Sequence, residues 1–319
     1  MKPVLHILTG PTAVGKTEWA LRWAERAGAE IVSCDSLLFY RGMDIGTAKV
    51  PIGERQGVPH HLLDVLDPRQ DATVADYQGW ARAALADLAA LGRTPVAVGG
   101  SGLYVRALLD HLEFPGTDPR LRAALEARAD AEGPRALHAE LAAADPAAAE
   151  RIGPHNARRI VRALEVIALT GRPYSSSLPQ HVYAVPAVQI GLDCDRATLD
   201  ARVAARVARM WDAGLVDEVE GLVARGGLGR TAARAVGYAQ VLALLAGRMG
   251  RRQAYDETVV ATRRLARRQM GWFGRDPRVH WLDAQHPDLV GRALDLVERA
   301  RAGDLPDPGA EPSARRLGS

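Results

Sequence analysis

The chain has 319 residues, of which 47% are hydrophobic and 25% are charged, as in ordinary globular proteins. This length allows roughly two domains, and no apolar run approaches the roughly 18 residues that a membrane-spanning helix needs. The segment before the first glycine-rich loop is too short to hold the apolar core of a signal peptide. We therefore expect a cytoplasmic protein with no membrane as a partner.

Apolar runs alternate with amphipathic stretches over the first part of the chain. Buried parallel strands are predicted at residues 4–8, 29–34, 60–65 and 94–100. Helices are predicted at residues 17–26, 75–92 and 102–112. This alternation predicts an α/β fold built on a doubly wound parallel sheet.

The alternation stops at residues 114–183, which are rich in alanine and contain no predicted strand. Helices are expected there at 121–133, 135–152 and 156–171, so the segment is interpreted as a helical insertion domain. After it, strands are predicted at 187–194 and 279–283, and helices within 196–225 and 236–275. The expected domains are the two parts of the α/β core at 1–113 and 184–301, the insertion at 114–183, and a disordered tail at 302–319.

The sequence GPTAVGKT, residues 10–17, follows the first predicted strand and opens the first predicted helix. It matches G-x-x-x-x-G-K-[ST], a loop whose backbone amides and following helix N-terminus bind phosphate. Gly10 and Gly15 permit the tight turn, Lys16 adds a positive charge, and Thr17 offers a hydroxyl to Mg²⁺. The pattern predicts a P-loop-type phosphate site, with a chance glycine turn as the alternative.

Two further polar residues, Asp35 and Ser101, each follow a predicted strand. The carboxyl ends of parallel strands meet at the ligand crevice, so both side chains are expected there. Asp35 can orient an acceptor, hold Mg²⁺, act as a general base or cap the following turn, and Ser101 can bind an anion or cap a helix. Asp64 and Asp193 are candidates for the metal-holding acid found in nucleotide hydrolases and kinases.

Positive charge is concentrated in arginine-rich segments. The run TRRLARRQMGWFGR, residues 262–275, has five arginines and no acidic residue, and NARRIVR spans residues 156–162. Arg202, Arg206 and Arg209 recur at helical spacing, so that one of them can reach a bound diphosphate. Guanidinium groups suit phosphate recognition, although a solvated or salt-bridged helix face is the alternative for each segment.

Six segments together resemble the tRNA dimethylallyltransferase family. In chain order they are GPTAVGKT, CDSLLFYRGMDIGTAK, GVPHHLLD, VGGSGLYVRALL, RRIVRALEV and RRQMGW. GMDIGTAK is distinctive, whereas the glycine-rich loop is common to many phosphate-binding proteins. Members of this family transfer a dimethylallyl group from its diphosphate to N6 of the adenosine just 3′ of the anticodon in tRNA.

The resemblance implies partners and roles for the matching residues. Dimethylallyl diphosphate and tRNA, through its anticodon stem-loop, are the implied partners, Mg²⁺ is the implied cofactor, and we expect a monomer. The implied catalytic residues are Asp35, Thr17 and Arg206. Asp35 is the base on N6, Thr17 supplies the Mg²⁺-linked hydroxyl, and Arg206 lies beside the diphosphate. Asp35 is also a second candidate ligand of the metal. The other residues of the implied diphosphate site are Gly10, Pro11, Thr12, Ala13, Val14, Gly15, Lys16 and Ser101. In many other proteins the same loop pattern binds a nucleotide such as ATP. The implied tRNA contacts are Asp35, Ser36, Leu37, Leu38, Ser101, Arg122, Arg158, Arg159, Ile160, Val161, Arg162, Arg267, Arg268, Gln269 and Trp272.

The chain departs from the family pattern at two positions. Ser101 stands where many relatives have threonine, which keeps the hydroxyl, and Ala239 stands where a basic residue is common, which removes one expected phosphate contact. Two other functions are compatible with part of the sequence. A P-loop kinase of a small metabolite or nucleotide does not account for GMDIGTAK, and a non-catalytic RNA-binding module does not account for the intact Lys16, Thr17 and Asp35.

Overall fold

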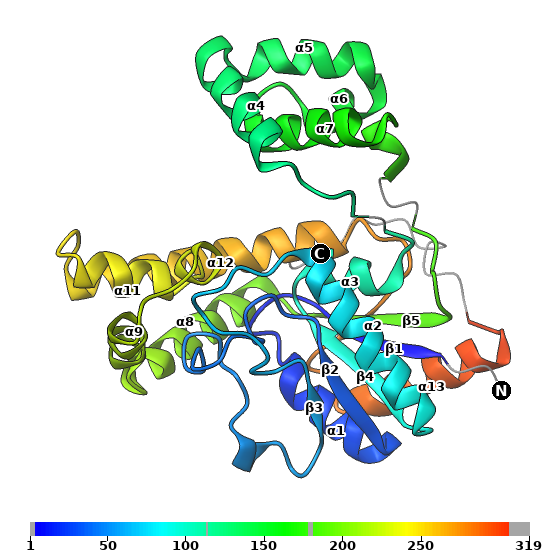
Figure 1. Cartoon of the computed structure of the whole chain (residues 1–319). Helices are drawn as coiled ribbons and strands as arrows, with labels where there is room; N and C mark the ends of the chain where they lie inside the picture. The colour runs from blue at the N-terminus through cyan, green and yellow to red at the C-terminus, as the bar shows by residue number, and fades with distance from the viewer. Residues whose placement is uncertain (1–3, 113, 178–180, 306–319) are drawn as a thin grey trace. The chain divides into compact units, whose positions relative to one another are not determined.

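The computed structural model describes residues 4–112, 114–177 and 181–305, so most of the expected disordered tail lies outside the described residues. The chain divides into two compact units, Met1–Leu109 with Tyr183–Ser319, and Asp110–Val182. The larger unit is an α/β structure and the smaller one is built from helices (Figure 1). In the part of the chain that the structure describes, no helix is both long and apolar enough to cross a membrane.

A parallel sheet of six strands in the order β3-β2-β4-β1-β5-β6 forms the centre of the larger unit. The strands are β1 (Leu5–Thr9), β2 (Ala29–Ser33), β3 (His60–His61), β4 (Thr94–Gly99), β5 (Ala187–Asp193) and β6 (Val279–Asp283). Every residue of β1 and β5 is buried, as expected for central parallel strands. The predicted α/β class is confirmed, but the strand predicted at 60–65 is wrong beyond His61, because Leu62 and Asp64 have left-handed φ angles of 62° and 58° that end the extended chain.

Helices cover both faces of this sheet. The helices of the larger unit are α1 (Lys16–Ala27), α2 (Val74–Ala90), α3 (Gly102–Leu109), α8 (Arg196–Asp212), α9 (Leu215–Ala224), α10 (Arg230–Ala233), α11 (Tyr238–Leu245), α12 (Arg251–Phe273) and α13 (Leu289–Ala302), with a 3-10 turn η1 (Ile52–Glu54). The crossovers from β1 to β2 and from β3 to β4 run in opposite directions along the sheet, so right-handed connections place α1 and α2 on opposite faces. The sequence analysis missed α13, whose buried residues Leu289, Ala293 and Val297 recur at helical spacing.

The smaller unit contains α4 (Pro119–Glu132), α5 (Pro134–Ala144), α6 (Pro146–Ile152), α7 (Ala157–Thr170) and a 3-10 turn η2 (Tyr174–Ser177). Its core includes Leu137 and Leu141 of α5 and Ile160 of α7, all without exposed surface. The single helix predicted at 135–152 is wrong. Asp145 accepts a hydrogen bond from the amide of Ala148 and Pro146 starts a new helix, because proline cannot continue the preceding one.

The larger unit closes where the helical segment leaves it. The amide of Ala184 donates a 2.7 Å hydrogen bond to the carbonyl oxygen of Leu109, so the two ends of the segment meet within that unit. The sheet therefore continues from β4 and α3 to β5 as though residues 110–182 were a long insertion in one connection.

Candidate active site

The sheet order brings three sequence-predicted features to neighbouring strand ends. β2 leads to Asp35, β4 leads to Ser101 and β1 leads to the loop 10–17, and these strands are adjacent in the sheet. A crevice of about 1500 Å³ opens at this edge. Its walls include the loop, the segment after β2, the GMDIGTAK segment (residues 42–49), α8 and α12.

The loop 10–17 is held in a compact turn against β5. Gly10 has a φ of 140°, and a Cβ atom there would lie 2.6 Å from the carbonyl oxygen of Leu192, so only glycine fits. The Lys16 ammonium group donates hydrogen bonds to the carbonyl oxygens of Gly10 (3.0 Å) and Pro11 (2.7 Å). Desolvation and the charge of Arg206 together lower the pKa of Lys16 to about 7, with the charge of Asp35 acting in the opposite direction. Thr17, in the first turn of α1, is exposed.

Asp35 combines a local role with a position at the crevice. Its Oδ1 atom accepts a 3.0 Å hydrogen bond from the amide of Leu37, so the side chain caps its own turn, as one alternative predicted. Its negative charge also acts on both Lys16 and Arg206, where it opposes the lowering of their pKa values by burial. A carboxylate has two oxygens, so the cap leaves Oδ2 for a ligand.

Ser101 lies between these groups. Its Oγ atom accepts a 3.3 Å hydrogen bond from the amide of Ser36 and donates one of 3.3 Å to Ser36 Oγ. The Ser101 hydroxyl therefore ties the end of β4 to the turn after β2. Both serines line the crevice together with Leu37 and Leu38.

Two arginines of α8 reach across the crevice. Arg202 donates a 3.0 Å hydrogen bond to the carbonyl oxygen of Val14, and Arg206 donates one of 3.1 Å to the carbonyl oxygen of Thr47. Desolvation lowers the pKa of Arg206, and Asp35 opposes this shift. The helical spacing alone did not separate the three arginines of this helix, whereas the family resemblance named Arg206. The structure places Arg206 in the crevice and joins Arg202 to the loop.

A buried lysine anchors the GMDIGTAK segment. Lys49 Nζ donates hydrogen bonds to the Tyr40 carbonyl oxygen (2.7 Å), Asp44 Oδ1 (2.7 Å) and Asp64 Oδ1 (2.6 Å). Asp64, a candidate metal-holding acid, therefore serves as an ion-pair partner. The other candidate, Asp193, is buried and accepts a hydrogen bond from the amide of Cys194.

Glu218 of α9 holds the same segment from the other side. Its carboxylate accepts hydrogen bonds from the amides of Asp44 (2.9 Å), Ile45 (2.7 Å) and Gly46 (3.2 Å), and from the Tyr238 hydroxyl (2.6 Å). The sequence analysis missed Glu218 and Tyr238. No local pattern marks Glu218, since its partners in GMDIGTAK lie more than 170 positions away.

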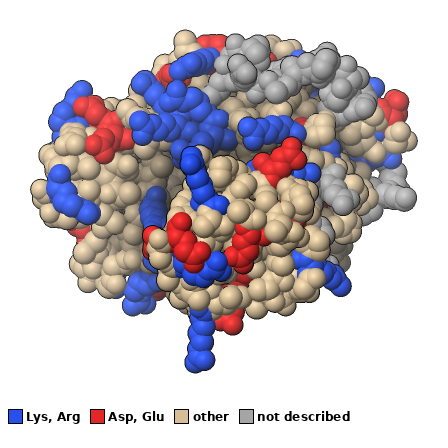
Figure 2. Space-filling model, turned by 90° about the horizontal axis from the view of Figure 1, so that it is seen from above, with Lys and Arg blue, Asp and Glu red and all other residues tan. Residues whose placement is uncertain are grey.

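Helix α12 carries the arginine-rich run. Arg264, Arg267, Arg268 and Trp272 are exposed, whereas Arg263 is half-buried and lies 3.6 Å from the Asp200 carboxylate. Gln269, a predicted tRNA contact, hydrogen bonds to the backbone of Thr12 and Gly100. Figure 2 shows that lysine and arginine side chains gather on part of one face of the molecule. Ala239, at the departure from the family pattern, is half-buried in α11.

The helical unit holds the remaining predicted tRNA contacts. Arg158 and Arg159 are exposed on α7, while Ile160 and Val161 are buried in the core of the unit. Arg122 and Arg162 both pair with the buried carboxylate of Glu165. Burial raises the pKa of Glu165, but hydrogen bonds from the two arginines outweigh it and hold the pKa below its usual value.

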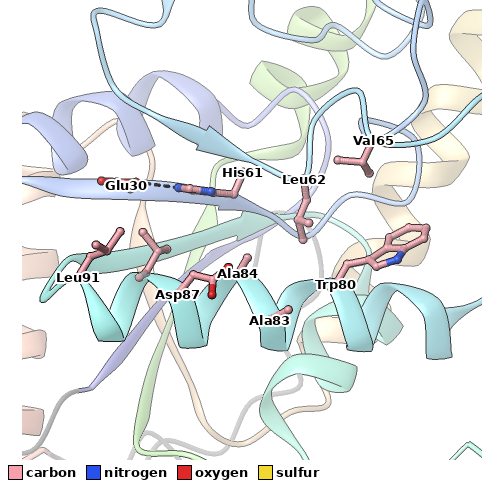
Figure 3. Close-up of a pocket in the computed structure, with 10 residues that line it drawn as sticks. Glu30, His61, Leu62, Val65, Trp80, Ala83, Ala84, Asp87 and Leu91 are labelled. Atoms are coloured by element: carbon pink, nitrogen blue, oxygen red, sulfur yellow. Dashed lines mark hydrogen bonds and ion pairs between the residues drawn. The ribbon is translucent and has the colours of Figure 1, made fainter.

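A second cavity, of about 450 Å³, lies at the edge of the sheet between α2 and the segment around β3 (Figure 3). Leu62, Val65, Trp80 and Leu91 supply apolar walls, and His61 pairs with Glu30 at 2.7 Å. It contains none of the sequence-predicted site residues. In the part of the chain that the structure describes, no group of three or more His, Cys, Asp or Glu side chains can hold a metal ion.

A parallel sheet with a phosphate-binding loop after its central strand defines a P-loop-type protein. The family model described as IPP transferase matches residues 38–276. The chain is 60% identical over 304 residues to the tRNA dimethylallyltransferase of Thermobifida fusca, covering 93% of this chain and 95% of the relative. It is 56% identical over 301 residues to the tRNA dimethylallyltransferase of Streptomyces coelicolor, covering 93% and 96%. The crystal structure of the tRNA isopentenylpyrophosphate transferase from Bacillus halodurans matches with a TM-score of 0.69 at 38% identity, covering 97% of this chain and 99% of that one. The chain belongs to the IPP transferase family, which confirms the resemblance drawn from its motifs.

Proposed function

We propose that this protein transfers a dimethylallyl group from dimethylallyl diphosphate to N6 of the adenosine 3′-adjacent to the anticodon in tRNA, releasing diphosphate. The observation that carries this proposal is one crevice whose lining includes the loop 10–17, the Asp35 carboxylate, Arg202 and Arg206. Relatives at 56–60% identity that are named tRNA dimethylallyltransferase support the same reaction.

The loop side of the crevice suits the leaving group. The first amides of α1 have no helical acceptor, so they and the positive end of the helix dipole attract an anion. Lys16 and Arg206 add charge to neutralise the diphosphate as it departs, and Arg202 braces the loop at Val14. Electrostatic stabilisation of a departing group is the largest contribution available to such a site.

Asp35 suits the proton that must leave N6. The N6 lone pair attacks C1 of the dimethylallyl group, the bond from C1 to the diphosphate oxygen breaks, and one N6 proton passes to the Asp35 carboxylate. The target adenosine has to leave its base stack to reach the crevice, as in other enzymes that modify bases. Ser36, Leu37 and Leu38 form the wall next to Asp35 and are the proposed contacts of this nucleotide.

The oxygen donors at the loop fit Mg²⁺. This ion keeps several waters and is bound through one or two carboxylates plus substrate phosphates, so one carboxylate beside a bound diphosphate is enough to hold it. We assign the Thr17 hydroxyl, with Asp35 as a second ligand. When bound, the ion neutralises charge on the diphosphate.

Two surfaces are proposed to bind tRNA, one in each unit. The first is the exposed stripe of α12 formed by Arg264, Arg267, Arg268 and Trp272. The second is the exposed pair Arg158 and Arg159 on α7 of the helical unit. We propose that Arg122 and Arg162 mainly position α4 and α7 through Glu165. The anticodon stem-loop is the part of tRNA that the two surfaces are proposed to bind.

Nucleoside mass analysis tests the proposal. Unmodified tRNA is incubated with the protein, dimethylallyl diphosphate and Mg²⁺, digested and analysed for an adenosine that has gained one C5 unit. Its appearance, dependent on all three components, is the expected result. Turnover of ATP in the absence of tRNA, with no modified adenosine, would support the kinase instead.

A further inference from the structure

We propose that Gln269 is a positioning residue that fixes the diphosphate-binding loop from α12, a role beyond the tRNA contact that the family pattern implies. Its Oε1 atom accepts a 2.7 Å hydrogen bond from the amide of Thr12, and its Nε2 atom donates one of 2.9 Å to the carbonyl oxygen of Gly100. One side chain therefore joins the loop after β1, the turn after β4 and the arginine-rich helix. The inference rests on the proposed function, because it concerns the diphosphate site.

The bridge holds the part of the loop that precedes the amides at the start of α1. Thr12 lies early in the loop, before the amides of the Gly15, Lys16 and Thr17 turn at the start of α1. With the Thr12 amide bound to Gln269, this part of the loop is held toward α12. The orphan amides of the helix start remain available for an anion. Lys16 bonds to the carbonyl oxygens of Gly10 and Pro11, so the same short segment is held on both sides.

The turn after β4 is shaped to admit this glutamine. A Cβ atom on Gly100 would lie 2.5 Å from Gln269 Nε2, which is too close for both to stay in place. The next helical turn of α12 packs equally tightly, since a Cβ atom on Gly102 would lie 1.8 Å from the Trp272 ring. Glycines at these positions therefore let α12 approach the ends of β1 and β4.

A double-mutant cycle on Gln269 and Gly100 tests the bridge. Gln269→Ala removes both hydrogen bonds. Gly100→Ala displaces the side-chain amide group of Gln269 while leaving the glutamine in the chain. Binding of inorganic diphosphate with Mg²⁺ is measured by calorimetry without tRNA, together with the thermal stability of each variant. Each single change is expected to raise the Kd about 3–10-fold, as the loss of one or two hydrogen bonds does. The double variant should be no worse than Gln269→Ala, because the Cβ atom added at position 100 then meets no glutamine.

Three results overturn the bridge while leaving the proposed function in place. A Gln269→Ala Kd within twofold of wild type would leave Gln269 as a tRNA contact only. Tighter diphosphate binding would make it a placeholder that competes with the ligand, and multiplying effects in the double variant would make the two sites independent. The control is Gln253→Ala, which removes a surface glutamine of the same helix paired with Glu257. Failure of the wild-type protein to bind diphosphate would instead overturn the proposed function, and the bridge with it.

Discussion

The hydroxyl group of Tyr238 donates a 2.6 Å hydrogen bond to Oε1 of Glu218, and the same carboxylate accepts three backbone amides of the GMDIGTAK segment. Burial and the negative charge of Glu218 raise the pKa of Tyr238, so it remains a donor. This segment also presents the Thr47 carbonyl oxygen to Arg206. Glu218 thus holds the segment that supplies the hydrogen-bond acceptor of Arg206, although it lies on a different helix.

Replacing Glu218 should therefore destabilise the larger unit. In Glu218→Gln the side-chain nitrogen of the glutamine is a donor and faces the backbone N–H groups of the segment. One or more of these N–H groups therefore lose their acceptor. We expect the free energy of unfolding to fall by about 1–3 kcal/mol, because hydrogen bonds to a charged acceptor contribute about 1.5–3 kcal/mol and these are only partly buried. Urea denaturation measures the change. Glu220→Gln, an exposed residue of the same helix, is the control, and equal stability of the two variants would argue against the clamp.

Lys16→Ala should weaken diphosphate binding about 10–150-fold while tRNA binding survives, because a charge-assisted hydrogen bond is lost. The difference should depend on pH. The pKa of Lys16 is about 7 in the ligand-free protein, so the lysine is charged below that pH and loses its proton above it. The ratio of the two Kd values should therefore shrink as the pH rises from 6 to 9. Using the ratio cancels the ionisation of diphosphate itself, and a ratio that stays constant would show that the Lys16 charge does not act on the ligand.

Asp35→Asn separates catalysis from turn capping. Asparagine keeps an acceptor oxygen for the Leu37 amide but loses the basicity needed to accept the N6 proton. Single-turnover transfer with saturating donor and tRNA should slow by about 10²–10⁴-fold, the usual contribution of a positioned base. Diphosphate binding measured without Mg²⁺ should change little, and a loss that appears only with Mg²⁺ would mark Asp35 as a metal ligand rather than the base. Asp212→Asn, at an exposed position of α8, is the control, and a loss below about threefold would leave Asp35 as a turn cap.

The salt dependence of tRNA binding tests the α12 stripe. Changing Arg267 and Arg268 to Gln should weaken binding and reduce the slope of log K against log salt by about 0.7–0.9 per lost phosphate contact. Arg252→Gln is the control, because that arginine pairs with Asp256 on the same helix. A slope equal to that of wild type would return the stripe to a solvated helix face.

The sequence predicted the parts of the site that depend on local order. The loop 10–17, Asp35 and Ser101 each follow a strand, and the parallel sheet brings such strand ends together without further information. The α/β class followed from the alternation of apolar strands with amphipathic helices along the chain. The division of the expected helix 135–152 was also readable, because Pro146 follows a residue with capping ability.

Contacts between distant segments could not be predicted in this way. Glu218, Gln269 and Glu165 are ordinary polar residues in helices, and their roles come from partners that only the tertiary structure brings near. Arg263 is an example in which the sequence pattern did not predict an ion pair. It has the same spacing as the exposed arginines of α12, yet Asp200 of α8 lies beside it.

The position of β1 at the centre of the sheet has a consequence for synthesis on the ribosome. Its neighbour β4 emerges early, but Leu5 lies opposite Ala187 of β5, which emerges only after the whole segment 110–182. The helices α4 to α7 pack on one another through nearby residues, so this segment can fold while one edge of β1 still lacks its partner. An unpaired edge invites aggregation, and the nascent chain is therefore most vulnerable between the folding of these helices and the arrival of β5.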